Sequence, residues 1–349
     1  MIFSKSKNVL GLDIGSSSIK ILELKSGKGG YALANFGIEP LPPETIVDST
    51  IMNGPAVVNA IRKLVSTYQI KTKEVVTSIS GHSVIIRKIT MPMMTEEEVE
   101  GNIQWEAEQY IPFDINEVNI DYFILEPMME EQENLDVLLV AVKKEIVGEY
   151  ISVVEEAGLT PVVMDVDAFA VENMFEVNYD PQPGKIVALV NIGASVININ
   201  VVKGTNPAFT RDISIGGNQY TEEIQKQLNL TFEDAENLKV SGGTGADHLP
   251  DLLDGISSNI ALEIQRSLDF FTSTSSLGQI SKVYLSGGCA KTLNLDKIIE
   301  KQVGLPVEVM NPFARIEVPA KSFDQDFIRE VAPMAGVAVG LALRRAGDK

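Results

Sequence analysis

Two stretches of the chain share one pattern of apolar, glycine and polar positions. Residues 9–24 read VLGLDIGSSSIKILEL and residues 187–202 read VALVNIGASVININVV, and the two align without a gap. In each stretch, alternating apolar residues lead into a glycine-containing turn and resume after it, which is typical of a β-hairpin. The one acidic position differs, because Asp13 aligns with Asn191. We therefore predict a duplicated α/β chain in which each half opens with a glycine-turn hairpin.

The pattern between the two hairpins predicts an inserted subdomain. Helical spacing of apolar residues over 54–68 and a strand over 74–80 complete the first part of the chain. Over 84–158 two helices and three strands follow, and the first helix opens with a capping box formed by Thr95 and Glu98. This stretch reads as an α+β unit of its own.

These patterns define the predicted parts of the chain. The first half comprises residues 1–83 and 159–184, the inserted subdomain residues 84–158, and the second half residues 185–349. Within the second half, the helices of about 218–280 form a smaller subdomain, and a last helix over 333–345 packs back at the hinge.

The composition excludes several classes of chemistry. The chain has 48 acidic and 29 basic residues and a formal net charge of −19, which repels phosphate backbones and predicts no nucleic-acid partner. Cys289 is the one cysteine, so an intramolecular disulfide and a cysteine metal cage are excluded. Two histidines, His82 and His248, leave almost nothing for a histidine metal site or a Ser-His-Asp triad.

No segment has the pattern of a signal peptide or of a membrane span. The N-terminal residues lack a sustained apolar run, and the apolar segment at 331–345 is shorter than the roughly 20 residues that a span needs. We therefore expect a cytoplasmic protein.

The two glycine turns have the composition of a phosphate-binding site. A turn of glycine and serine presents several backbone N–H groups and hydroxyls to one point, which suits a phosphate group. Asp13 stands beside the first turn, and Mg²⁺ on a phosphate prefers carboxylate and water oxygens. Two such turns facing each other would clamp a nucleoside triphosphate. The alternative is that GSSS is only the turn of a hairpin.

Five motifs resemble the signature of the actin, Hsp70 and sugar-kinase superfamily and occur in its order. They read LGLDIGSSSIKIL, VVMDVDAFAVENMF, ALVNIGASVININ, VYLSGGCAKTLNL and AGVAVGLAL. Residues 91–125, which contain WEAEQYIPF, are similar to the type IV pilus assembly protein PilM family, which is related to the cell-division protein FtsA. The resemblance implies an actin-like fold, with duplicated ribonuclease H-like halves around a nucleotide cleft and an FtsA-type α+β insertion. It also implies ATP and Mg²⁺ as cofactors.

The resemblance assigns nucleotide-binding roles to residues in five places. The expected set is Asp13, Gly15, Ser16, Ser17, Ser18 and Lys20 in the first phosphate loop, Asn191, Gly193, Ala194 and Ser195 in the second, Gly216 and Gly217 before a covering helix, Glu236 and Lys239 near the ribose and adenine, and Ser286, Gly287 and Gly288 in the adenosine loop. Asp13 would hold Mg²⁺ through water. Lys20 has the alternative of pointing outward from its strand. Glu236 and Lys239 have the alternative of a solvent-exposed ion pair.

Asn191 departs from the family pattern. Members that turn over nucleotide generally carry an aspartate in the second phosphate loop, and an asparagine keeps the size and an acceptor oxygen but removes the charge. An amide is poorly suited to neutralise Mg²⁺ or to take a proton from an attacking water. We therefore expect Mg·ATP to be bound and hydrolysed slowly or not at all.

Three aromatic residues of the insertion have two interpretations. Trp105, Tyr110 and Phe113 could pack in the core of the inserted subdomain, or they could line an apolar groove for an extended peptide. In the PilM family this region receives the cytoplasmic N-terminal tail of PilN, a bitopic inner-membrane protein. The resemblance thus implies a scaffold at the inner face of the inner membrane. Pilus motor ATPases and a second copy of the chain are further partners to consider.

Two other functions stay open at this point. A filament protein like FtsA is one, although residues 341–349 show no amphipathic helix that would tether it to a membrane. The other is a small-molecule kinase, which would need a second carboxylate such as Asp165 or Asp167. The segment MDVDAFA, however, suits a strand end and a helix N-cap equally well.

Overall fold

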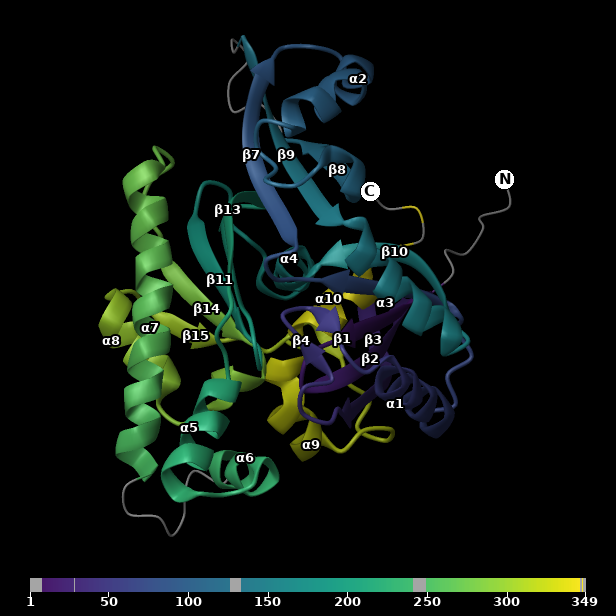
Figure 1. Ribbon diagram of the computed structural model, residues 1–349, viewed down its shortest axis with the longest axis vertical. Coiled ribbons are helices and arrows are strands. Elements are labelled where there is room, and N and C mark those ends of the chain that lie inside the picture. The colour runs from purple at the N-terminus through teal and green to yellow at the C-terminus, as the bar shows by residue number, and fades with distance from the viewer. Residues whose placement is uncertain (1–7, 28, 126–132, 241–248, 346, 348–349) are drawn as a thin grey trace.

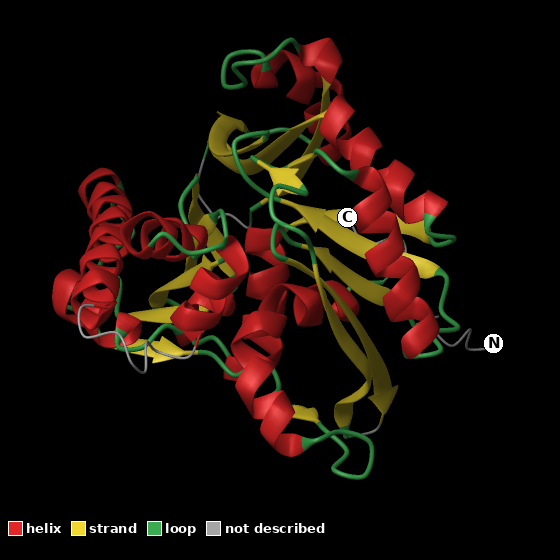
Figure 2. Ribbon diagram, turned by 60° about the horizontal axis from the view of Figure 1, so that its bottom comes forward, coloured by secondary structure: helices red, strands yellow, loops and turns green. Residues whose placement is uncertain are grey.

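The structure is a computed structural model that describes residues 8–27, 29–125, 133–240, 249–345 and 347. Two large sheets, each covered by helices, form the body of the molecule, and a smaller unit projects from one end (Figure 1). Helices flank the strands on the left and right of the view in Figure 2. The predictions on the first residues and on the C-terminal tail fall partly outside the described residues. Among the helices that the structure describes, none is long and apolar enough to cross a membrane.

The first sheet has six strands in the order β10-β6-β1-β2-β3-β16. Its strands are β1 (Leu10–Ile14), β2 (Ser18–Gly27), β3 (Gly30–Pro40), β6 (Glu74–Ile79), β10 (Thr160–Val166) and β16 (Ile316–Glu317). All five residues of β1 are buried, which explains the continuous apolar run at the start of the chain. Helices α1 (Gly54–Thr67) and α3 (Lys144–Glu156) pack together over this sheet.

The second sheet has five strands in the order β13-β12-β11-β14-β15. They are β11 (Ile186–Ile192), β12 (Ile197–Lys203), β13 (Asn206–Ile213), β14 (Lys282–Ser286) and β15 (Val307–Val309). Helices α7 (Leu249–Thr274) and α8 (Leu295–Val303) pack against it, and α5 (Asn218–Leu228) and α6 (Phe232–Val240) lie beyond its end. The sequence pattern does not predict β13, because Pro207 interrupts it and all but one of its residues are partly buried on both faces.

The two predicted hairpins are present and have matching registers. In the first, Asp13 of β1 pairs with Lys20 of β2, and in the second Asn191 of β11 pairs with Asn198 of β12. Each hairpin lies in the interior of its sheet, with a parallel neighbour, β6 or β14, on one side. The duplication is therefore visible at the level of single residue pairs.

Helices α4 (Asp167–Tyr179) and α10 (Gly336–Leu343) make the closest helix–helix contact near the hinge. A Cβ atom on Gly340 would lie 1.7 Å from the carbonyl oxygen of Ala170, so only glycine permits this approach. The chain reaches α10 through α9 (Gln325–Val331) and a 3₁₀ turn, Ala332–Ala335, where the sequence predicts one helix starting at residue 333. Pro333 accounts for the break.

The projecting unit is an antiparallel sheet with one helix on it. Strands β7 (Val84–Pro92), β9 (Asn134–Lys143) and β8 (Val118–Ile124) lie in that order, and α2 (Glu96–Ala107) buries Val99, Ile103 and Ala107 against one face. The predicted capping box of Thr95 and Glu98 is confirmed in both of its hydrogen bonds. Two short strands, β4 (Ile46–Val47) and β5 (Thr50–Ile51), and a 3₁₀ turn, Ile115–Glu117, complete the described elements.

Candidate functional site

A cleft of about 1480 Å³ lies between the two halves. The turns of both hairpins open into it, and α5, α6 and the loop after β14 complete its wall. It is lined by most of the predicted nucleotide-binding residues, namely Asp13, Gly15, Ser16, Ser17, Ser18, Lys20, Asn191, Gly193, Ala194, Ser195, Gly217, Glu236, Lys239, Gly287 and Gly288. Gly216 and Ser286 lie directly behind them. The structure thus brings segments from across the chain to one place.

The first turn carries a buried ion pair. Lys20 Nζ donates to Asp13 Oδ2 over 3.0 Å, and the two side chains are 11% and 12% exposed. The outward orientation considered for Lys20 is therefore wrong, because its pairing with Asp13 turns it into the cleft. The lysine places a positive charge beside the glycine-serine turn, where it can meet an anionic ligand.

The second turn carries amides at the same two positions. Asn191 Nδ2 donates to Asn198 Oδ1 over 3.0 Å, and Ser286 Oγ donates to Asn191 Oδ1 over 3.1 Å. Asn198 in turn donates to Asp212. Asn198 and Asp212 were missed at the sequence level, although the repeated register of the two hairpins offered a signal for Asn198.

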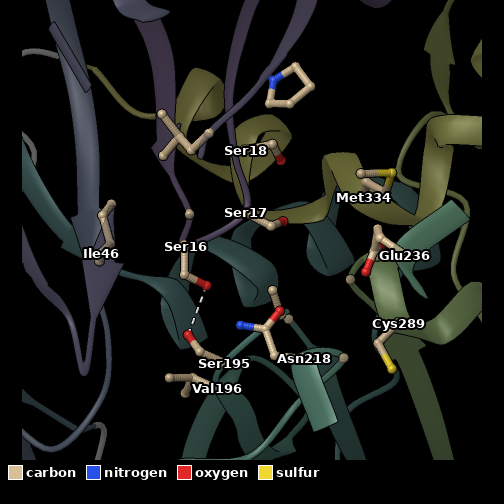
Figure 3. A pocket seen from close by; sticks show the side chains of 18 of the residues that line it. Ser16, Ser17, Ser18, Ile46, Ser195, Val196, Asn218, Glu236, Cys289 and Met334 are labelled. Atoms are coloured by element: carbon tan, nitrogen blue, oxygen red, sulfur yellow. Dashed lines mark hydrogen bonds between the residues drawn. The ribbon is translucent and has the colours of Figure 1, made fainter. Parts of the chain in front are cut away.

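The two turns touch each other across the cleft. Ser195 Oγ donates to Ser16 Oγ over 2.8 Å, although the residues are 179 positions apart (Figure 3). A single hydrogen bond between two hydroxyls is easily exchanged for bonds to a phosphate oxygen. The two turns are therefore close enough to act on one ligand together.

Two glycines shape the wall behind the second turn. A Cβ on Gly216 would lie 2.6 Å from the carbonyl oxygen of Gly193, and a Cβ on Gly287 would lie 2.3 Å from that of Ile192. Gly287 also has a φ of +92°, which other residues rarely adopt. Glycine is required at both positions because the backbones of three segments converge on one turn and leave no space for a Cβ atom.

Glu236 and Lys239 form an ion pair that is sheltered at the lysine and partly exposed at the glutamate. Lys239 Nζ lies 2.5 Å from Glu236 Oε2, and its side chain is 15% exposed. Lys239 also donates to Thr221 Oγ1 over 3.0 Å and to the carbonyl oxygen of Gly217 over 3.3 Å. Glu236 lies on the same side of the cleft as Cys289 in Figure 3. The ion pair ties α6 to the turn before α5, and its polar atoms line the cleft.

Asp167 and Asp165, the two carboxylates considered for a kinase, have different environments. Asp167 lines the cleft at the start of α4, and Ser78 Oγ donates to it over 2.6 Å. Burial, and then the nearby carboxylate of Asp13, raise the pKa of Asp167 to about 6. Asp165 lies 3.3 Å from Arg344 Nε in a buried ion pair and does not line the cleft. Of these two residues, only Asp167 could act on a ligand in the cleft.

The cleft suits Mg²⁺ held mainly through water. Among the described residues no group of three or more histidine, cysteine, aspartate or glutamate side chains could hold a metal. Mg²⁺ commonly takes one or two carboxylates and keeps several waters. Asp13, with Asp167 nearby, is such a set. The thiol of Cys289 is no ligand, because burial raises its pKa to about 11 and keeps it protonated.

The aromatic residues of the insertion lie away from the cleft. The side chain of Trp105 is 73% exposed and that of Tyr110 is 41% exposed, so the core-packing interpretation is wrong for both. Phe113 is half-buried, packs against the core of the subdomain and carries Lys143 Nζ 4.5 Å from its ring centroid. Exposed aromatic residues of this size are available for contact with a partner.

Duplicated α/β halves that face one cleft through matched glycine turns define the actin-like class of proteins. The chain belongs to the type IV pilus assembly protein PilM family, whose model matches residues 11–346. It is similar to a chain of the solved PilM-PilN type IV pilus biogenesis complex, with 31% identity, coverage of 97% of this chain and 99% of that chain, and a TM-score of 0.88.

More distant structures share the fold alone. Ethanolamine utilization protein EutJ from Carboxydothermus hydrogenoformans has 14% identity, coverage of 97% of this chain and 90% of that chain, and a TM-score of 0.60. MreB5 of Spiroplasma citri bound to AMPPNP has 13% identity, coverage of 96% and 95%, and a TM-score of 0.52. These matches confirm the predicted actin-like fold.

Proposed function

We propose that this chain binds Mg·ATP in the cleft and serves as a scaffold of type IV pilus assembly that holds the cytoplasmic tail of a PilN-type membrane protein. The observation that carries the nucleotide site is the contact between the two glycine turns, Ser195 to Ser16, beside the buried pair of Lys20 and Asp13. Family membership and the similarity to a PilM-PilN complex support the partner. The protein would then lie at the cytoplasmic face of the inner membrane through that partner.

Different residues of the cleft would bind the phosphates, the metal ion and the nucleoside of ATP. The two turns supply backbone N–H groups and hydroxyls for the phosphates, and Lys20 adds a positive charge. Asp13 would hold Mg²⁺ through water, and the ion would neutralise the phosphate charge when bound. The ion pair of Glu236 and Lys239 would contact the nucleoside end.

Slow or absent hydrolysis follows from the charges around the second turn. Asn191 carries no charge, and its amide already bonds to Ser286 and Asn198. Asp167 lines the cleft and could accept a proton from water, but its carboxylate already accepts a hydrogen bond from Ser78. Binding without rapid turnover makes the nucleotide a clamp or a switch rather than a fuel.

Retention of radiolabelled ATP on a filter, followed by chromatography, tests the nucleotide site. Wild type should retain intact ATP, and Lys239→Met should lose at least about tenfold in affinity, because one charge-assisted contact is worth about 1.5–3 kcal/mol. Lys226→Met is the matched control, since Lys226 lies on the neighbouring helix with its side chain 80% exposed. Equal retention by both variants would refute the site, and recovery of ADP would refute slow turnover.

The inserted subdomain has the chemistry of a surface for a basic, partly apolar segment. Residues 84–158 contain 18 acidic and four basic residues, which is most of the net negative charge of the chain. Trp105 and Tyr110 are exposed on and just after α2, whose first turn holds Glu96, Glu97 and Glu98. Such a surface attracts a positively charged tail and buries its apolar side chains against the rings.

The single tryptophan makes the partner contact measurable. Because Trp105 is the only tryptophan and is 73% exposed, its fluorescence reports directly on whether a peptide covers α2. Titration with a synthetic PilN-type tail should shift the emission to shorter wavelength, and Trp105→Ala should weaken binding of a dye-labelled tail by about tenfold or more. Phe327→Ala, an exposed aromatic on α9, is the matched control. Binding without any change in emission would place the tail elsewhere.

A further inference from the structure

Asp212 lies outside the residues that line the cleft, yet it ends a line of hydrogen bonds that begins there. Ser286 Oγ donates to Asn191 Oδ1 over 3.1 Å, and Asn191 Nδ2 donates to Asn198 Oδ1 over 3.0 Å. Asn198 Nδ2 then donates to Asp212 Oδ1 over 2.9 Å. The other oxygen, Oδ2, accepts the backbone N–H of Gly81 over 2.5 Å. We call these five residues the amide relay.

The carboxylate at one end determines the direction of every bond in the relay. An ionised carboxylate only accepts, so Asn198 must turn its Nδ2 toward Asp212. Its Oδ1 is then left to accept from Asn191, and the Oδ1 of Asn191 is left to accept from Ser286. The orientation of an amide in the second phosphate turn is thus determined by a residue two side chains away.

The relay also joins the two halves. Asp212 is on β13 of the second half, whereas Gly81 lies two positions after the end of β6 of the first half and three positions before the start of β7 of the insertion. Gly81 has a φ of +91°, so its N–H is presented from a backbone conformation that favours glycine. The second turn of the cleft is therefore connected to the base of the inserted subdomain.

We propose that Asp212 is a positioning residue of the nucleotide site, which orients the amide of Asn191 and ties the second phosphate turn to the base of the inserted subdomain. This inference rests on the proposed function for its role toward ATP. The first turn holds its negative charge in the cleft, at Asp13. The second turn holds its charge at Asp212, behind two amides.

A new carboxylate at position 191 conflicts with Asp212. In Asn191→Asp both ends of the relay only accept, and Asn198 can give its Nδ2 to just one of them. Its Oδ1 then faces the other carboxylate, unless a proton is shared. Adding Asp212→Asn removes the conflict, because Asn198 can reverse and accept from the new amide at position 212. That amide keeps an oxygen for the N–H of Gly81, so every donor has an acceptor.

The test is a double-mutant cycle on unfolding, without nucleotide, on wild type, Asn191→Asp, Asp212→Asn and the double variant. Denaturant unfolding at about pH 8 should show Asn191→Asp losing about 100-fold in the folding equilibrium, and the double variant recovering to within about fivefold of wild type. If the fold-losses of the two single variants in the folding equilibrium simply multiply in the double variant, the relay is overturned. Asp269→Asn, on an exposed position of α7, controls for the change in net charge.

A pH profile separates the relay from general damage. The loss in Asn191→Asp should shrink as the pH is lowered, because a proton on either carboxyl group supplies a donor to the relay. Burial already raises the pKa of Asp212, and the titratable group beside it, Asp167 on α4, is present in all four proteins, so the cycle cancels it. A loss that does not change with pH would contradict the shared proton and overturn the relay.

Retention of ATP tests the positioning role itself. Asp212→Asn frees the relay to reverse and should weaken ATP retention about tenfold while Asp269→Asn leaves it unchanged. Unchanged retention in Asp212→Asn would overturn the positioning role. Failure of wild type to retain ATP would instead refute the proposed function, and the unfolding cycle would still decide whether the relay exists.

Discussion

Glu172 should make the protein less stable as the pH rises. It lies on α4 with 6% of its surface exposed, and Asn200 Nδ2 of β12 donates to its Oε2 over 2.7 Å. Burial raises the pKa of Glu172 from its ordinary 4.5 to about 8, and the carboxylates of Glu176 and Asp165 add to the rise. The buried carboxyl group is therefore neutral at pH 7.

The sign of the effect follows from where the proton is held. Between about pH 4.5 and pH 8 the folded protein keeps the proton on Glu172, and the unfolded chain has lost it. Unfolding therefore releases a proton, and the free energy of unfolding falls by about 1.4 kcal/mol for each pH unit in this window. Below about pH 6 the raised pKa of Asp167 adds a similar slope, so the test of Glu172 is made above that value.

Glu172→Gln is the perturbation that tests this reasoning. Glutamine keeps an acceptor oxygen for Asn200 and carries no proton to lose, so stability should fall less steeply with pH. Urea unfolding at several values between about pH 6.5 and pH 7.5 should give a slope about 1.4 kcal/mol per unit shallower than that of wild type. The variant should also be the more stable protein at about pH 7.5. Parallel slopes would refute the burial argument.

Three further substitutions have expected outcomes. Gly340→Ala should cost 3 kcal/mol or more, because its Cβ collides with the carbonyl of Ala170 and α10 must move away from α4, and thermal unfolding measures it. Lys20→Met should lower the free energy of unfolding by about 2 kcal/mol and weaken ATP retention, because Asp13 loses its partner. The loss should stay below the roughly 3–5 kcal/mol of a fully buried pair, because the cleft admits water. Thr95→Ala should cost about 1 kcal/mol of helix stability in urea unfolding, and a loss near zero would mean that the cap is redundant.

The fold was largely predictable because its signals are local and repeated. Two hairpins with one pattern indicated two halves, and the capping box at Thr95 marked the start of α2. Elements without such signals were missed. Helix α9 has seven residues and a mostly exposed surface, and β13 is interrupted by Pro207, so neither shows a clear period.

The candidate site was predictable where it is built from turns and not where it depends on long-range contacts. The glycine and serine positions follow from the turn chemistry that brings backbone N–H groups together. The placement of Asp167 in the cleft wall depends on how α4 packs, and the bond from Gly81 to Asp212 joins residues 131 positions apart. No local pattern carries that information. The nucleotide-binding roles of the turn residues stay predictions until ATP is tested.

The comparison of the two hairpins explains why an asparagine at position 191 is a coherent choice rather than a loss. At equivalent register positions the first half pairs Asp13 with Lys20, and the second half pairs Asn191 with Asn198. An aspartate at 191 without a lysine at 198 would leave a charge unpaired between two buried strands, and Asp212 would add a second negative charge behind it. The second turn therefore presents two uncharged amides, Asn191 and Asn198, to the cleft, and its negative charge lies behind them at Asp212. A catalytically active second turn would require at least two coordinated changes.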